Sequence, residues 1–530
     1  MHGGETLDKN QRTLIDALRD PSVFGSDRAR FDMIETHISW VFLCGGYAYK
    51  IKKALNLGFL DFSTLQRRRF YCHEELRLNG RLAPGLYLAV VPITGTPAQP
   101  RLGGAGAPFE YAVKMRRFEQ KSLLSALLKR GSLSAAHIDE IIALVADFHQ
   151  RIAAAAAGDR YGEPEQVVAP ARENVVQIRQ HALGAGQARL LDDISHWCEQ
   201  QHRARRDDLQ ARKAQGFIRE CHGDMHLGNM AVIDGRVVIF DGIEFNPDLY
   251  WIDVISEAAF VCMDLDHHHR QALAWRFWNG YFERTGDYAG LRVARYYLVY
   301  RAMVRAKIAW IRLHQETAAS ARPLLEQRFD NYLQLARSYT RPRPPVLLIT
   351  HGLSGSGKST LTGPLSEQWG AIRVRSDRER QRLAGGGIPA DAADEPVRIG
   401  QGRYSSDTTA QTYDRLAQLA QSVVASGYNV IIDAAFLERR QRDQFRELAA
   451  RLGVPMRILH CRAAADVLSQ RVRQRRLAGR DISEADLRVL AHQLATYREL
   501  GDDERDDTVT VDTQAAHTAK AVLELLQRSL

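Results

Sequence analysis

Apolar and polar positions follow two different patterns along the chain, and the pattern changes near residue 345. Beyond this point, short apolar runs of strand length alternate with longer stretches of helical character. These runs are Val346–Thr350, Ala371–Val374, Asn429–Asp433, Met456–His460 and Thr508–Val511. Such alternation predicts an α/β domain with a mainly parallel sheet and helices on both of its faces.

The chain before residue 340 has a different pattern, which predicts an α+β domain. Strand candidates surround one helical stretch, Arg67–Leu82, and the pattern is mostly helical from Ser122 onward. The strand candidates are Ile38–Leu43, Tyr47–Ile51, Leu86–Ile93 and Tyr111–Met115. We therefore expect a small β-rich lobe over about 30–118 and a larger helical lobe over about 119–335. The alanine run 153–157 is expected to lie in a helix, because alanine has the highest helix propensity.

The boundary between the two patterns is Arg341-Pro342-Arg343-Pro344-Pro345. Three prolines in five residues exclude a helix and favour an extended spacer. We therefore expect a first domain over 1–340, a linker over 341–345 and a second domain over 346–530.

Composition is that of a soluble protein, with 45% hydrophobic and 25% charged residues. No apolar run approaches the roughly 18 residues of a membrane span, and the N-terminus lacks the apolar core of a secretory signal. We expect a cytoplasmic protein without a membrane partner. The six cysteines lack zinc-site spacing, and a net charge of +9 suits nucleotides or nucleic acid without deciding between them.

The most specific motif directly follows the apolar run at 346–349 and fits G-x-x-x-x-G-K-[ST]. It predicts a phosphate-binding (Walker A) loop, in which backbone N–H groups and a helix N-terminus surround the phosphates of ATP. Lys358 would reach the β- and γ-phosphates, and Ser359 would hold Mg²⁺. The expected nucleotide-binding residues are Gly352, Leu353, Ser354, Gly355, Ser356, Gly357, Lys358, Ser359 and Thr360.

Other charged residues of the second domain resemble the active site of small P-loop kinases such as gluconate kinase, polynucleotide 5′-kinase and the zeta-toxin group. This resemblance implies that Asp377 meets the acceptor hydroxyl with the help of Arg380. Asp433, at the end of a buried strand, is the expected second Mg²⁺ ligand. Arginines of one basic helix and the following loop would close over the triphosphate, and we select Arg471, Arg475 and Arg480. The alternatives are a helix-capping role for Asp377 and a solvated basic helix.

The first domain contains Cys221-His222-Gly223-Asp224-Met225-His226-Leu227-Gly228-Asn229. Asn229 follows Asp224 by five residues, and Asp241 follows Asn229 by twelve. This spacing resembles the catalytic segment of kinase-like phosphotransferases, and the His-Gly-Asp form looks like the aminoglycoside phosphotransferase and choline kinase branch. The resemblance implies that Asp224 accepts the proton of a substrate hydroxyl, while Asn229 and Asp241 hold Mg²⁺ on ATP.

In that branch, a lysine on a strand contacts the nucleotide phosphates and is oriented by a glutamate on the next helix. Element order favours Lys50 with Glu75, although Lys52 and Lys114 are alternatives. Of the glycine-rich loop of protein kinases, G-x-G-x-x-G, only Gly45-Gly46 is present. The sequence therefore does not establish how this lobe would contact the phosphates.

The complete arrangement resembles a bacterial family described as bifunctional aminoglycoside phosphotransferase and ATP-binding proteins. This resemblance implies an ATP- and Mg²⁺-dependent phosphotransferase with two kinase centres that act on hydroxyls of small molecules. One alternative makes the first domain a ligand-binding regulator of the P-loop kinase. Another is a nucleic-acid 5′-hydroxyl kinase, which the scarcity of aromatic residues near the basic helix disfavours. The motifs encode neither the acceptor nor the oligomeric state.

Overall fold

The computed structural model describes residues 9–25, 31–57, 60–385, 406–478, 487–515 and 519–529. The chain forms two compact units. Unit 1 comprises Met1–Pro170 and Leu209–Asp264, and unit 2 comprises Ala171–Asp208 and Leu265–Leu530. The proline-rich segment at 341–345 lies inside unit 2, and the predicted domain limits stay a prediction.

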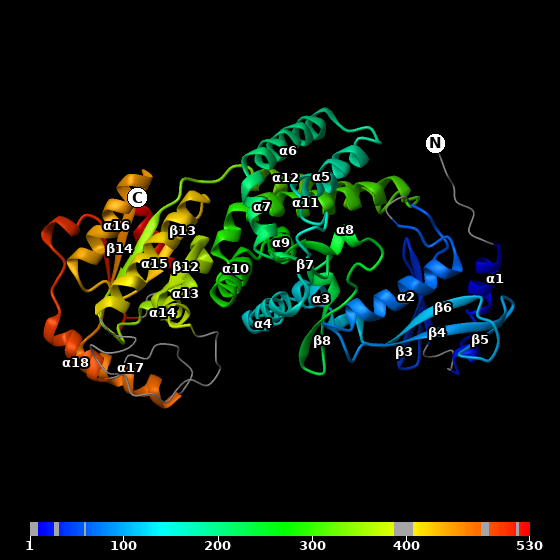
Figure 1. Cartoon of the computed structure of the whole chain (residues 1–530), viewed down its shortest axis with the longest axis horizontal. Coiled ribbons are helices and arrows are strands. Elements are labelled where there is room, and N and C mark those ends of the chain that lie inside the picture. Colours follow the sequence, from blue (N-terminus) through cyan, green and yellow to red (C-terminus); the bar gives the residue numbers. More distant parts are fainter. Residues whose placement is uncertain are drawn as a thin grey trace. The chain divides into compact units, whose positions relative to one another are not determined.

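Unit 1 begins with a six-stranded antiparallel sheet in the order β1-β2-β3-β6-β4-β5. The strands are β1 (Phe31–Glu35), β2 (Ser39–Cys44), β3 (Tyr47–Lys52), β4 (Tyr87–Thr96), β5 (Gln99–Leu102) and β6 (Glu110–Arg116). Helix α2 (Leu65–Asn79) begins at Thr64, whose side chain accepts a hydrogen bond from the Arg67 N–H, and lies along the sheet against β4 and β6 (Figure 1). Buried Cys72, Leu86 and Val113 join this helix to the sheet. The expected strands and helix are confirmed, with small shifts at their ends.

The helical part of unit 1 carries two small antiparallel ladders that flank the segment 221–229. Strand β7 (Ile218–Glu220) pairs with β10 (Trp251–Asp253), and β8 (Met230–Ile233) pairs with β9 (Arg236–Ile239). The segment 221–229 connects β7 to β8. This part of unit 1 also contains α3 (Leu124–Lys129), α4 (Ala135–Arg151) and α8 (Pro247–Tyr250), whereas α1 (Lys9–Ala17) packs on the six-stranded sheet.

The prediction that the alanine run is helical is wrong. Helix α4 ends at Arg151, and the following backbone pairs with β7 instead. The Glu220 N–H donates to the Ala153 carbonyl (2.9 Å), and the Ala155 N–H donates to the Ile218 carbonyl (2.8 Å). These tertiary backbone hydrogen bonds override the weak helix propensity of five alanines.

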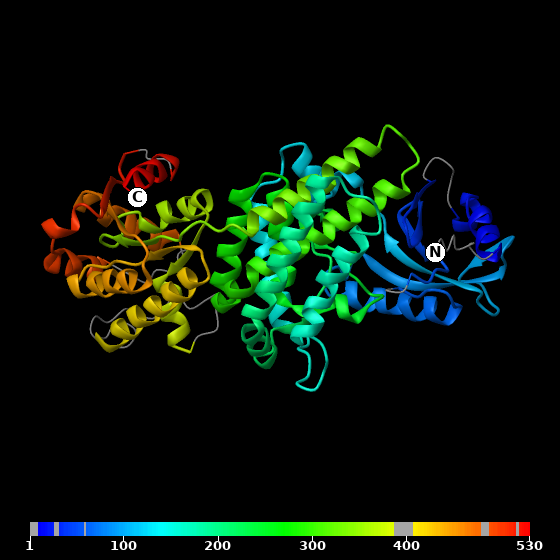
Figure 2. The ribbon, with the colours of Figure 1, turned by 90° about the horizontal axis from the view of Figure 1, so that it is seen from above.

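Unit 2 combines long helices with the predicted α/β fold. The helices before residue 340 include α6 (Ala185–Ala204), α10 (Gln271–Thr285), α11 (Leu291–Gln315) and α12 (Arg322–Tyr339). Helices α11 and α12 pack side by side (Figure 1, Figure 2). Three further helices, α5 (Pro164–Ile178), α7 (Arg206–Ala214) and α9 (Val254–His267), contain residues of both units.

The α/β part of unit 2 contains the expected five-stranded parallel sheet, in the order β12-β13-β11-β14-β15. Its strands are β11 (Leu347–His351), β12 (Ala371–Arg375), β13 (Asn429–Asp433), β14 (Met456–Arg462) and β15 (Thr508–Asp512). All five residues of the central strand β11 are buried, as expected for a parallel strand covered on both faces. Helices α13 (Lys358–Trp369) and α19 (Ala519–Ser529) pack together, as do α15 (Ser406–Ala425) and α16 (Arg439–Leu452).

The remaining helices of this part are α14 (Ser376–Leu383), α17 (Ala465–Ala478) and α18 (Leu487–Thr496). Across the described portions of the chain, no helix has both the length and the apolar character needed to cross a bilayer.

Candidate active sites

The phosphate-binding loop lies between β11 and α13, at the carboxyl edge of the parallel sheet. Gly355 has a φ of 81°, and a Cβ atom at this position would lie 2.8 Å from the Leu468 carbonyl oxygen of α17. Any other residue here would suffer both backbone strain and a steric clash. The glycine therefore lets the loop pack closely against α17.

Lys358 is the first residue of α13, and its side chain turns back into the loop. The Nζ donates to the carbonyls of Gly352 and Leu353, each at 2.8 Å. Burial lowers the pKa of Lys358, whereas the nearby Asp433 and Asp377 carboxylates act in the opposite direction. A cation is thus held at the centre of the loop, where the sequence predicts the phosphates.

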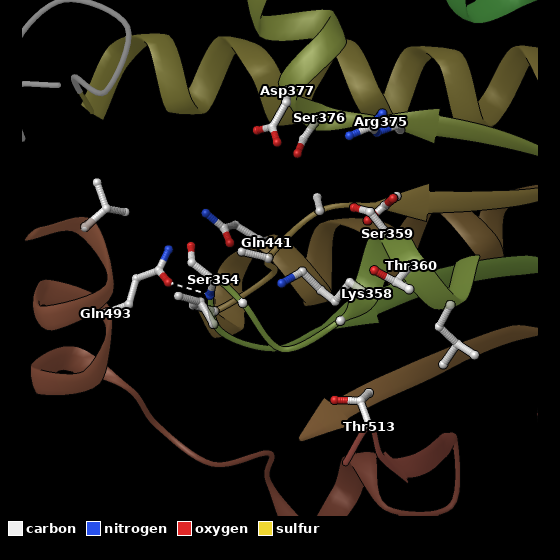
Figure 3. A pocket seen from close by; sticks show the side chains of 18 of the residues that line it. Ser354, Lys358, Ser359, Thr360, Arg375, Ser376, Asp377, Gln441, Gln493 and Thr513 are labelled. Atoms are coloured by element: carbon white, nitrogen blue, oxygen red, sulfur yellow. Dashed lines mark hydrogen bonds between the residues drawn. The ribbon is translucent and has the colours of Figure 1, made fainter. Parts of the chain in front are cut away.

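One cavity of about 1080 Å³ brings the predicted residues of the second domain together. Its lining includes Lys358, Ser359, Asp377, Arg380, Asp433, Arg471 and Arg475. In Figure 3, Asp377 lies across this cavity from Lys358, and Ser359 and Thr360 mark the start of α13. Arg480 lies outside the described residues.

The two acids of the cavity come from neighbouring strand ends. Asp433 ends β13 and is buried, and its Oδ2 accepts a hydrogen bond from Thr362 Oγ1 (3.0 Å). Asp377 lies in the first turn of α14, directly after β12, and its Oδ1 is 3.3 Å from Arg380 Nη1. The predicted pairing of Asp377 with Arg380 is thus present in the structure.

Arg471 contacts the loop after β15. Its guanidinium donates to Thr513 Oγ1 (2.9 Å), to the Thr513 carbonyl (2.8 Å) and to the Gly355 carbonyl (3.4 Å). Gln493 of α18 accepts a hydrogen bond from the Ser354 N–H at 2.8 Å (Figure 3). Thr513 and Gln493 are not among the residues predicted from the sequence. Only the position of Thr513, just beyond a predicted strand end, pointed to the site.

The structure also brings together the predicted residues of unit 1. Asn229 Nδ2 donates to Asp224 Oδ2 (2.9 Å) and to the Asp241 carbonyl (3.4 Å). Asp241 Oδ1 accepts a hydrogen bond from Lys50 Nζ (2.7 Å). Asp241 has a φ of 60°, a conformation that non-glycine residues rarely adopt and that concentrates at functional sites.

The three candidate lysines have different surroundings. Lys50 forms ion pairs with Glu75 (2.8 Å) and Asp241 (2.7 Å), so it touches both the helix and the acid after β9. Lys52 pairs with the other oxygen of Glu75 (2.6 Å) and with Glu244, and its side chain is 1% exposed. Lys114 Nζ lies over the Tyr47 ring, 3.9 Å from its centre.

The Glu75 carboxylate is shared between two lysines. Burial would raise the pKa of Glu75, but Lys50 and Lys52 outweigh this effect and lower the pKa to about 2. Glu244, which the sequence analysis missed, is also buried, and desolvation raises its pKa against the opposing effect of Lys52. No spacing rule connects Glu244 to a lysine 192 residues earlier in the chain.

The Gly45-Gly46 turn lies away from the candidate phosphate lysine. The Gly46 carbonyl accepts a hydrogen bond from the Arg117 N–H (2.9 Å), beyond the end of β6, whereas Lys50 is opposite Val113. The turn helps to line a cavity of about 470 Å³ that also contacts residues 117–120. The connection between β1 and β2, at the Lys52 end of the sheet, is 36–38 and contains no glycine.

Further residues hold the segment 221–229 and the backbone around Asp241 in place. Glu257 Oε1 accepts hydrogen bonds from the backbone N–H groups of His222 (2.8 Å) and Gly223 (2.6 Å). Tyr87 Oη accepts a hydrogen bond from the Asp241 N–H (3.1 Å), and Asn79 Oδ1 accepts one from the Gly242 N–H (2.7 Å). These last two contacts could not be predicted from the sequence, because they join segments 154 and 163 residues apart.

Both sites offer the oxygen ligands that Mg²⁺ prefers. The Asp241 side chain is 49% exposed, and Asn229 contributes an amide oxygen within the same cluster. Ser359 and Asp433 provide a hydroxyl and a carboxylate in the P-loop cavity. The chemistry of these donor sets therefore fits the metal that accompanies ATP.

The chain is similar to a protein-family model and to solved structures of kinases. Residues 347–500 match the model of a family described as AAA domain. The solved structure of a gluconokinase from Sinorhizobium meliloti 1021 is 22% identical in sequence. The match covers 36% of this chain and 91% of the gluconokinase chain, with a TM-score of 0.24. The solved structure of a choline kinase from Cryptosporidium parvum Iowa II is 9% identical. This match covers 62% of this chain and 96% of the choline kinase chain, with a TM-score of 0.39.

Two mycobacterial proteins match most of the chain. These are "Uncharacterized protein Rv2004c" of Mycobacterium tuberculosis strain H37Rv and "Uncharacterized protein Mb2027c" of Mycobacterium bovis. Each is 30% identical over 450 residues, which cover 84% of this chain and 86% of the relative. The chain therefore belongs to the family of these mycobacterial proteins.

Proposed function

We propose that the protein is an ATP-dependent phosphotransferase with two kinase centres, each of which transfers the γ-phosphoryl group of ATP to a hydroxyl of a small-molecule acceptor. One observation carries this proposal. A single cavity holds the P-loop cation Lys358, the strand-end acid Asp433 and a second acid, Asp377, on the opposite wall. Lys358 and Asp433 suffice to bind ATP with Mg²⁺, whereas phosphoryl transfer also needs a group that orients the nucleophile, and Asp377 would do this for an acceptor hydroxyl.

In the P-loop centre, residues 352–360 would bind the triphosphate, and Asp377 would accept a hydrogen bond from the acceptor hydroxyl. Arg475 would neutralise charge that develops on the transferred group, and Arg471 would hold the loop that it contacts. Mg²⁺, bound by Ser359 and Asp433, would supply further charge neutralisation on ATP. Positioning and charge compensation thus account for the reaction without a covalent intermediate.

In the centre of unit 1, Asp224 would orient the acceptor hydroxyl, and Lys50, held by Glu75, would contact the nucleotide phosphates. Asn229 and Asp241 would hold Mg²⁺. The support for these roles is the contact chain from Glu75 through Lys50 and Asp241 to Asn229 and Asp224. Such a chain places a cation, two metal-ligand types and a base within one cluster.

The two-centre arrangement also fits the bifunctional aminoglycoside phosphotransferase-like and ATP-binding family that the sequence resembles. We propose a cytoplasmic protein with a small-molecule acceptor as its partner and no membrane partner. Nucleic acid is the less favoured acceptor, because base stacking needs aromatic side chains and α17 has none.

The test is a transfer screen with γ-labelled ATP and Mg²⁺ across aminoglycosides, sugars, nucleosides and oligonucleotides. The parent protein is compared with Asp224→Asn and Lys358→Ala. We expect each variant to lose about 10²-fold or more in transfer at its own centre and to keep the activity of the other. Transfer by neither centre to any acceptor would refute the proposal.

A second candidate function makes unit 1 a ligand-binding regulator of the P-loop kinase. The observation in its favour is the glycine-free connection at 36–38, which lacks the backbone flexibility of a kinase phosphate loop. In this case Asp224→Asn would leave every transfer reaction of the parent unchanged. The same screen therefore distinguishes the two functions.

A further inference from the structure

Helix α10 precedes the proline-rich segment, yet it runs along the edge of the P-loop sheet within unit 2. Strand β12 is an edge strand, so one side of its backbone lacks a neighbouring strand. Asn279 of α10 fills this place. Its Nδ2 donates to the Ala371 carbonyl (3.0 Å), and its Oδ1 accepts from the Arg373 N–H (2.7 Å). One side-chain amide thus replaces the hydrogen bonds of a missing strand.

Glu283 lies one helical turn after Asn279 and faces the same strand. Its Oε1 accepts from Arg378 Nε (3.0 Å) and Arg375 Nη1 (3.3 Å), and its Oε2 is 3.5 Å from Arg373 Nη2. The Glu283 side chain is only 13% exposed. Burial alone would raise its pKa, but the three arginines lower the pKa below its usual value. The residue is therefore the shared counter-ion of three guanidinium groups.

Two of these arginines, Arg375 and Arg378, lie within two residues of Asp377, the candidate acceptor acid of the P-loop cavity. Arg375 precedes Asp377 by two residues and lines the cavity with it, and Arg378 directly follows it. Arg375 also pairs in the sheet with Asp433, the other acid of the cavity. Without the charge of Glu283, three cations would repel one another beside two carboxylates on which the reaction depends. Arg375 would then be drawn to those carboxylates.

We infer that Glu283 is a positioning residue of the P-loop centre, which holds Arg375 and Arg378 so that Asp377 stays available to the acceptor hydroxyl. This inference rests on the proposed function of that centre. It makes α10 a working part of the second kinase centre, although α10 lies outside the segment that matches the P-loop family. The backbone carbonyl of Glu283 also accepts a hydrogen bond from Arg382 of α14, so the helix contacts α14 at two points.

The test uses the full chain with Glu283→Gln, which keeps the side-chain size and removes the charge. Glu283→Asp keeps the charge on a shorter side chain. The matched control is Glu367→Gln. Glu367 Oε1 pairs with Arg276 of α10 (2.7 Å), and neither residue is part of the described lining of the P-loop cavity. Two quantities are measured: amide hydrogen exchange of residues 376–383 without substrate, and steady-state transfer with the best acceptor found in the screen.

We expect Glu283→Gln to exchange faster at 376–383 and to lose about tenfold in kcat, with the KM for ATP within about twofold of the parent. Glu283→Asp should recover part of both losses, and Glu367→Gln should match the parent. Equal behaviour of Glu283→Gln and Glu367→Gln would overturn the inference, as would a loss confined to ATP binding. If the parent transfers to no acceptor, the proposed function fails, and the exchange at 376–383 alone decides whether Glu283 holds α14.

Discussion

Lys50 and Lys52 lie two residues apart on the same face of β3, yet their partners give them different roles. Lys50 contacts Asp241, whose side chain is half exposed, so a ligand can reach this pair. Lys52 is enclosed between Glu75 and Glu244, all three of which are at most 4% exposed. Breaking a buried ion cluster of this kind is costly, because removal of one member leaves its partners charged, desolvated and without an opposite charge.

We predict that Lys52→Met destabilises unit 1 by about 3–5 kcal/mol, the usual cost of removing one partner from a buried ion pair. Lys50→Met should cost less, because Asp241 remains partly solvated. Urea denaturation followed by circular dichroism measures both effects. Transfer by the unit 1 centre should fall in both variants, but only Lys50→Met should combine that loss with a nearly parental unfolding midpoint. Equal stability losses would contradict this separation of roles.

Asp266, near the end of α9, is a second residue whose surroundings predict a measurable effect. Burial raises its pKa to about 7, and Tyr339 Oη donates a hydrogen bond to its Oδ2 (2.7 Å). Between pH 4 and 7 the folded chain therefore binds a proton that the unfolded chain has lost. The contribution of Asp266 to the free energy of unfolding therefore falls as the pH rises from 4 to 7 and is constant above this range.

Asp266→Asn keeps an acceptor for Tyr339 and removes the titration. We predict that the free energy of unfolding of the variant, relative to that of the parent, increases by roughly 2 kcal/mol from pH 5 to pH 8, after allowance for the partial exposure of Asp266. Urea unfolding of both proteins at the two pH values gives this difference. A difference that stays constant with pH would show that Asp266 is ionised throughout.

Among the elements, those with a local pattern could be predicted, and those fixed by distant partners could not. The strands of the parallel sheet were visible as buried apolar runs, and β13 was predicted at its observed bounds, Asn429–Asp433. The prediction of a helix at the alanine run is wrong because β7, over 60 residues later in the chain, supplies hydrogen-bond partners for the backbone of this run. The role of α10 at the sheet edge was also invisible, because Asn279 and Arg373 meet only in the folded chain.

The same division applies to the candidate sites. The P-loop motif and the segment 221–229 gather their candidate residues within a few positions, so spacing was enough to predict them. Glu244, Tyr87 and Thr513 act through contacts with segments 42 to 192 residues away. For such residues a sequence offers only a residue type. Gly45-Gly46 lies in the turn between β2 and β3, at the end of β3 opposite to Lys52.

The edge contact of α10 leads to a prediction about stability. Asn279→Ala removes the partner of one buried carbonyl and one backbone N–H, and we expect a loss of about 2–3 kcal/mol for unit 2. Gln271→Ala, at an exposed position of the same helix, should change the stability by less than about 0.5 kcal/mol. Chemical denaturation of both variants measures the difference. Equal stabilities would mean that water replaces the amide of Asn279 at this edge.

At the scale of the whole molecule, the two candidate centres would bind phosphate by different means. The P-loop would surround it with backbone N–H groups and Lys358, whereas the cluster in unit 1 would depend on Lys50 and on a metal held by Asn229 and Asp241. The two clusters belong to different compact units and share no residue. If both are nucleotide sites, binding should therefore be separable by single substitutions.

We predict that the parent binds two equivalents of a non-hydrolysable ATP analogue in the presence of Mg²⁺. Lys358→Ala removes the cation of the P-loop, and Asp241→Asn removes the carboxylate that faces Lys50, so each variant should bind one equivalent and the double variant none. Isothermal titration calorimetry gives the stoichiometry, and differential scanning calorimetry shows which unit the ligand stabilises. The unit 1 transition should still rise with ligand in Lys358→Ala, because its site is intact. A parent protein that binds a single equivalent, lost in Lys358→Ala and kept in Asp241→Asn, would contradict the two-centre proposal and leave the P-loop as the nucleotide site.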